Sequence, residues 1–203
     1  MYSTGLALLL SLALSAAAPG ADEHLLAGAT AFREERFDVA LVEFRVAQQL
    51  GAPDAAIYAA TALVKLNRAE EAVESFGPGV SPGQDALIDY YRAVACYEAR
   101  LYLCADHLMA AVGERAGPRI AGLAATVRAS IASTFATEPS HDTIDWYLSR
   151  CAAERKAKRT VLGDAYCREA AGLAQRRKDG YRKAEAEGGP SGKEKAPAAG
   201  SPR

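Results

Sequence analysis

Four cysteines are the side chains of this 203-residue sequence best suited to covalent or metal chemistry. A zinc site would need ligands at short spacings such as Cys-x2-Cys. These cysteines are instead separated by 8, 47 and 16 residues, so we expect neither a metal site nor any other cofactor. An even number of cysteines is typical of disulfides, and four of them allow three pairings.

The predicted helices favour one of these pairings. Cys96 and Cys104 flank one predicted interhelical turn, and Cys151 and Cys167 flank another. Each pair would lie at matched height on two antiparallel helices, which allows the short Cα separation that a disulfide requires. We predict the bridges Cys96–Cys104 and Cys151–Cys167, each contributing about 2–3 kcal/mol to stability. Four buried free thiols in a reducing compartment are the alternative.

The other residues that could do chemistry form no catalytic pattern. None of the three histidines, His24, His107 and His141, lies in a His-Glu-x-x-His context. The glycine-rich segment 77–83 lacks the Gly-Lys-Ser/Thr ending of a phosphate-binding loop, and no Gly-x-Ser-x-Gly nucleophile motif is present. The sequence therefore predicts a protein that is not an enzyme.

The N-terminal segment predicts the compartment. Residues 6–18 are an uncharged run of mostly Leu, Ala and Ser, followed by Pro19-Gly20-Ala21. This pattern predicts a secretory signal peptide over residues 1–21, and the run is shorter than the about 20 residues of a membrane-spanning helix. We expect an exported protein, periplasmic or secreted, in which disulfides persist. A retained membrane anchor is the alternative.

The elements that position the cysteines repeat along the chain. Small or hydrophobic residues recur at intervals of 32 and 33 in four columns. The columns are Gly28, Ala60 and Ala93; Ala31, Leu63 and Cys96; Phe37, Ala69 and Tyr102; and the pairs Ala40–Phe44, Ala72–Phe76 and Ala105–Met109. A charged or polar break divides each unit, which predicts helix, tight turn and helix. The small residues would let the paired helices approach closely, and the bulky residue one turn further on would fill the remaining space.

This spacing resembles the tetratricopeptide repeat (TPR), whose units carry small and bulky residues in the same order. The matching residues are Gly28, Ala31, Ala40, Phe44 and Ala47 in unit one, Ala60, Leu63, Ala72 and Phe76 in unit two, and Ala93, Cys96, Tyr102, Ala105 and Met109 in unit three. The resemblance implies an all-α protein, an α-solenoid of three TPR-like helical hairpins plus C-terminal helices. A generic array of helical hairpins is the alternative.

The segments after the repeats complete the expected domain organisation. Residues 22–137 are predicted to form the TPR-like repeat domain, which ends in a capping helix that starts at Gly117-Pro118. Residues 138–187 are predicted to form a basic C-terminal helical hairpin, and residues 188–203 a disordered tail rich in Gly, Pro, Ser, Ala and Lys.

The resemblance also implies a binding groove. In TPR proteins the first helix of each unit lines a concave groove that receives a peptide or helix. Carried over to this sequence, the groove would present Leu25, Phe32, Arg33, Ile57, Thr61, Lys65, Tyr90, Val94, Tyr97 and Glu98. The lysine and asparagine clamp of the chaperone-binding members is absent, because the matching places hold Leu25, Ala29, Tyr58, Leu87 and Tyr91. The groove therefore suits an amphipathic helix or apolar peptide better than a free carboxylate.

Charge is distributed unevenly along the chain. Residues 1–149 hold 10 Lys and Arg against 18 Asp and Glu, whereas residues 150–187 hold 11 against 6. The basic segment could make weak contact with an anionic membrane surface, or it could be an ordinary solvated helix face. An exported chain with an acidic body is not expected to bind nucleic acid.

Together these observations predict a non-catalytic, exported, TPR-like scaffold or adaptor that binds a peptide or helix of another cell-envelope protein. The alternatives are an accessory subunit of an envelope enzyme and a protein that associates with the membrane surface through its basic C-terminal helix. In a further alternative, the helices after residue 144 fold back and occupy the groove themselves.

Overall fold

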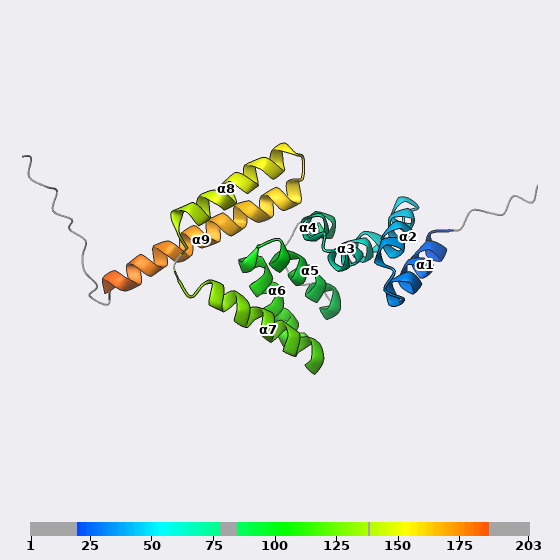
Figure 1. The fold of residues 1–203 in the computed structure, drawn as a ribbon, viewed down its shortest axis with the longest axis horizontal. Coiled ribbons are helices and arrows are strands. Elements are labelled where there is room, and N and C mark those ends of the chain that lie inside the picture. The colour runs from blue at the N-terminus through cyan, green and yellow to red at the C-terminus, as the bar shows by residue number, and fades with distance from the viewer. Residues whose placement is uncertain (1–19, 78–84, 138, 187–203) are drawn as a thin grey trace, which may run out of the picture.

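The described part of the chain is all-helical, as predicted. The computed structural model describes residues 20–77, 85–137 and 139–186, and within these ranges it contains nine helices and no strand (Figure 1). The predicted disordered tail and nearly all of the predicted signal peptide lie outside the described residues. The helices are α1 (Ala21–Arg33), α2 (Phe37–Gln49), α3 (Ala55–Lys65), α4 (Ala69–Phe76), α5 (Ala86–Glu98), α6 (Tyr102–Arg115), α7 (Pro118–Thr134), α8 (His141–Lys156) and α9 (Thr160–Ala186).

Helices that are neighbours in the chain are also neighbours in space. From α1 to α7 each helix packs against the next one, and α3 also touches α5. Helices α8 and α9 pack mainly against each other as a long antiparallel hairpin (Figure 1). None of the described helices is both long enough and apolar enough to cross a membrane.

Four of the helix pairs share one tight turn. In each, one residue adopts a positive φ and the next donates its backbone N–H to the carbonyl five residues earlier, which is the Schellman arrangement that ends many helices. The positive-φ residues are Glu35 (φ 60°), Asn67 (57°), Arg100 (63°) and Lys158 (63°). The hydrogen bonds run from Arg36 to Ala31 (2.9 Å), from Arg68 to Leu63 (3.0 Å), from Leu101 to Cys96 (2.7 Å) and from Arg159 to Glu154 (3.0 Å).

The small residues lie where the paired helices meet. A Cβ added to Gly28 would lie only 2.6 Å from the Phe44 ring, so this position has no room for a side chain. Ala60 and Ala93, the equivalent residues of the next two units, are completely buried. The expectation that these residues face neighbouring helices rather than water is therefore confirmed.

The hairpin of α8 and α9 is a fourth unit of the same kind. Measured from its turn residue, it places Cys151 where the first unit has Gly28, and Cys167 where the first unit has Phe44. Gly163 takes the place of Ala40, and a Cβ there would lie 2.8 Å from the Arg155 side chain. The sequence predicted a hairpin in this segment but not its shared register with the repeats.

Both predicted cysteine pairs lie at disulfide distance. The Cα atoms of Cys96 and Cys104 are 6.0 Å apart and those of Cys151 and Cys167 are 5.1 Å apart, within the usual range for a bridge. The first pair joins α5 to α6 across their turn. The second joins α8 to α9 at the position where the first unit has its contact between Gly28 and Phe44.

Candidate binding groove

The first helices of the three repeats, α1, α3 and α5, each present one face through residues spaced i, i+3 and i+7. At the 32- and 33-residue repeat intervals these faces form three rows. Row one is Leu26, Tyr58 and Tyr91; row two is Ala29, Thr61 and Val94; and row three is Arg33, Lys65 and Glu98. Rows one and two contain no charged residue, whereas every residue of row three is charged.

An apolar cavity of about 280 Å³ opens on these faces. Its walls come from α1, α2, α3 and α5 and from the residue before α5. They are Ala29, Phe32, Arg33, Phe44, Tyr58, Thr61, Asp85, Leu87, Ile88 and Tyr91. We call this cavity, together with rows one to three, the groove.

Aromatic rings form one side of the groove. The ring centroids of Phe32 and Tyr91 are 6.4 Å apart, so α1 and α5 touch through their side chains although α3 lies between them in the chain. Phe37 packs edge-on against Phe32 at 5.2 Å. The Lys65 ammonium lies 5.8 Å from the centroid of Phe37 and 5.5 Å from that of Tyr91, which is within cation–π range.

The residues expected to line the groove separate into three groups. Phe32, Arg33 and Thr61 line the cavity, and Lys65 covers its aromatic side. Val94 and Glu98 continue the α5 face that carries Tyr91. Leu25, Ile57, Tyr90 and Tyr97 do not line the cavity.

The position of Tyr97 has a clear physical reason. Its hydroxyl forms a 2.9 Å hydrogen bond with the Ser130 hydroxyl of α7, and its ring packs against Tyr102 at 5.7 Å. This tyrosine therefore joins α5 to α7. Leu25, Ile57 and Tyr90 each precede a row-one residue by one position, which turns them about 100° around the helix.

Tyr58 and Tyr91 are groove residues that were predicted only as the places matching a carboxylate clamp. The sequence could have predicted these two positions, because both are aromatic and are separated by 33 residues, the same interval as in the other columns. Tyr58 is 41% exposed and packs its ring against Phe44 at 5.6 Å. Leu87, at the start of α5, adds a further exposed apolar side chain to the cavity wall.

The C-terminal hairpin lies away from the groove. Helix α9 packs against α4 and α6, the second helices of their units (Figure 1). The alternative in which these helices fill the groove is therefore wrong. Leu162, Tyr166 and Leu173 of α9 are buried in one core cluster with residues of α4, α5 and α6. Carboxylates on α4 and α9 add polar contacts at this interface.

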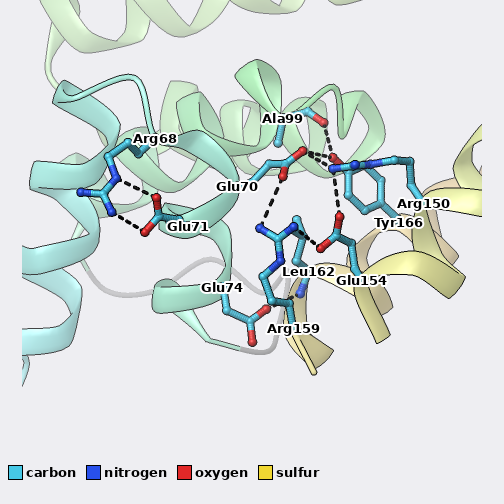
Figure 2. Close-up of polar contacts among 10 residues, drawn as sticks. All are labelled: Arg68, Glu70, Glu71, Glu74, Ala99, Arg150, Glu154, Arg159, Leu162 and Tyr166. Atoms are coloured by element: carbon cyan, nitrogen blue, oxygen red, sulfur yellow. Dashed lines mark hydrogen bonds and ion pairs between the residues drawn. The ribbon is translucent and has the colours of Figure 1, made fainter. Parts of the chain in front are cut away.

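Glu70 of α4 is the centre of these contacts (Figure 2). Its carboxylate pairs with the Arg150 guanidinium of α8 and lies 3.5 Å from that of Arg159. It also accepts a 3.1 Å hydrogen bond from the Tyr166 hydroxyl. Both arginines in turn pair with Glu154, which is almost completely buried and would otherwise be an uncompensated charge.

Two further carboxylates connect the α8–α9 hairpin to the repeat helices by capping helix N-termini across the interface. Glu74 of α4 accepts a 2.7 Å hydrogen bond from the backbone N–H of Leu162, in the first turn of α9 (Figure 2). In return, Glu169 of α9 accepts from the N–H groups of Leu103 (2.6 Å) and Cys104 (3.4 Å), in the first turn of α6. Each of these carboxylates, when ionised, places a negative charge at a helix start, which the helix dipole favours.

Burial dominates the titration of Glu169. Desolvation raises the pKa of its carboxyl group to about 7, although the backbone N–H groups of α6 and the charge of Arg176 oppose this shift. Burial also raises the pKa of Glu98 at the end of α5 and that of Tyr90 beside the groove. Within the described ranges, no group of three or more His, Cys, Asp or Glu residues is placed to hold a metal ion.

Comparison of the chain with protein-family models, with curated proteins and with solved structures found no match in any of the three. The resemblance to the tetratricopeptide repeat therefore remains a prediction based on the repeated columns.

Proposed function

We propose that this protein is an exported, non-catalytic scaffold that binds an apolar peptide or amphipathic helix of another cell-envelope protein in the groove. The observation that carries the proposal is the open apolar cavity on α1, α3 and α5. Its exposed apolar side chains would gain favourable burial from a partner, since each buried Å² of apolar surface is worth about 25 cal/mol.

The proposal includes the architecture. We interpret the helix pairs α1–α2, α3–α4 and α5–α6 as three TPR-like units of an α-solenoid, with α7 as the capping helix. Support comes from the shared turns, from the small residues at the helix crossings and from the packing of each helix against the next. Such stacked units characteristically use the concave face of the first helices for binding.

Export is supported by the sequence and by the cysteines. The uncharged segment 6–18 is typical of a secretory signal. All four cysteines lie in two pairs at disulfide distance, an arrangement that an oxidising compartment favours.

Site-specific photo-crosslinking in the producing cell tests this function. A photoreactive phenylalanine at Tyr58 would lie in the groove, whereas the same group at Val42, which is 59% exposed on α2 and outside the cavity wall, is the matched control. We expect a discrete protein adduct from position 58 and none from position 42. Equal adducts at both positions, or adducts at position 42 alone, would argue against groove binding.

A further inference from the structure

The charged row of the groove has an unusual member. Arg33, Lys65 and Glu98 are the last residues of α1, α3 and α5. The carboxyl end of a helix carries a partial negative charge, so Arg and Lys are stabilising there and a carboxylate is not. Arg33 and Lys65 therefore need no further explanation, whereas Glu98 occupies a position that disfavours its charge.

Glu98 also gains no compensation from its surroundings. Within the part of the chain that the structure describes, no cation forms an ion pair with Glu98, and burial penalises its charged form. Some surface carboxylates are compensated, in contrast to Glu98: Glu71 accepts two hydrogen bonds of 2.7 and 2.6 Å from Arg68.

The two cations of row three are likewise open to a partner. Among the described residues, Arg33 hydrogen-bonds only to groups of its own helix, the Ala29 carbonyl at 3.3 Å and the Thr30 hydroxyl at 3.3 Å. Lys65 rests over the rings of Phe37 and Tyr91. Neither cation meets a carboxylate among the described residues, and Arg33 lines the cavity itself.

Tyr91 and Glu98 are seven residues apart and share one face of α5. The apolar rows and the charged row are therefore parts of one surface. A helix laid across α1, α3 and α5 would bury its apolar face on rows one and two, and its flanking side chains would then meet two positive charges followed by a negative one.

We propose that row three selects the charge pattern of the bound helix: acidic side chains opposite Arg33 and Lys65, and a basic side chain opposite Glu98. The inference rests on the proposed function, because it describes the partner of the same groove. Exposed pairs of this kind are individually weak but decide which of several apolar helices binds best.

Three fluorescein-labelled peptides of one amphipathic helix test the inference. They share an apolar face and differ only in their flanking charges, which are mixed acidic and basic, all acidic or all basic. Fluorescence anisotropy measures their affinity for the wild-type protein. We expect the mixed peptide to bind about two- to fivefold more tightly than the other two, a preference that rising salt concentration weakens.

Glu98→Lys is the decisive variant, and it should fold well because a cation suits the end of a helix. It should shift the preference to the all-acidic peptide. Glu114→Lys, which makes the same charge change on exposed α6 surface, should leave the preference unchanged. If Glu98→Lys and Glu114→Lys change the peptide preference to the same extent, the charge selection is refuted while groove binding stands. If no peptide binds, or if Tyr91→Ala leaves the affinity of every peptide unchanged, the proposed function itself fails and the inference fails with it.

Discussion

Replacing Glu169 with Gln isolates the energetic effect of one buried carboxyl group. This side chain is 3% exposed and reaches from α9 to the backbone of Leu103 and Cys104 at the start of α6. Its pKa is raised from 4.5 to about 7, chiefly by desolvation. Gln keeps the shape and one accepting oxygen but does not titrate.

The direction of the effect follows from linkage. Because the native pKa of Glu169 exceeds the unfolded value, the folded protein holds this proton more tightly than the unfolded chain does. The resulting stabilisation is complete below pH 4.5 and is lost as the pH rises to about 7. A shift of 2.5 pKa units corresponds to about 3 kcal/mol at 1.36 kcal/mol per unit.

Urea unfolding of both proteins at a series of pH values from 4 to about 8.5, with the disulfides intact, measures this effect. We expect the stability of Glu169→Gln relative to wild type to increase by about 3 kcal/mol across this range. Other titrating groups largely cancel in the difference. A His107→Asn background removes the imidazole that lines the same pocket as Glu169. Parallel pH profiles for the two proteins would refute the reasoning.

Three other predictions concern helix packing, a disulfide and a buried charge. Gly28→Ala should lower the unfolding free energy by about 1–3 kcal/mol, because the added Cβ would meet the Phe44 ring. Gly113→Ala, which places its Cβ in open space on α6, should instead raise the unfolding free energy by about 1 kcal/mol. Thermal unfolding compares the two variants. Replacing Cys151 and Cys167 together by Ala should cost about 3 kcal/mol in urea unfolding, as expected for a loop of 16 residues, and no loss would mean that the bridge does not form. Asp89→Asn should cost about 2–3 kcal/mol by the same assay, because the completely buried carboxylate accepts a 2.6 Å hydrogen bond from Arg115; an unchanged midpoint would contradict this role.

Local residue size predicted much of the fold. The recurring small and bulky residues place the helix pairs because close packing depends on side-chain volume, which the sequence shows directly. The fourth hairpin escaped the same search for a physical reason. Its position equivalent to Ala31 is Glu154, a buried charge that breaks the apolar column and is tolerated only because two arginines pair with it.

The candidate site was harder to place from sequence. The resemblance directed attention to the first helices, but a shift of one residue separates Leu25, Ile57 and Tyr90 from the row that includes Tyr58 and Tyr91, and hydrophobicity alone does not distinguish the two. The docking of the hairpin could not be predicted. It depends on the burial of Leu162, Tyr166 and Leu173 in the shared core and on hydrogen bonds between residues 66 and 88 positions apart. Such long-range contacts leave no periodic signal in the sequence.

The central claim is that the groove on α1, α3 and α5 holds the partner. Its most direct test is the affinity of the segment identified by crosslinking for two variants of α5, measured by calorimetry with the fold of each variant checked by circular dichroism. Tyr91→Ala removes a ring from the cavity wall, whereas Tyr97→Ala removes the equally large side chain that binds Ser130 of α7. We predict that Tyr91→Ala weakens binding by about tenfold or more and that Tyr97→Ala leaves it unchanged. Loss of binding in Tyr97→Ala alone, with full affinity in Tyr91→Ala, would contradict the claim.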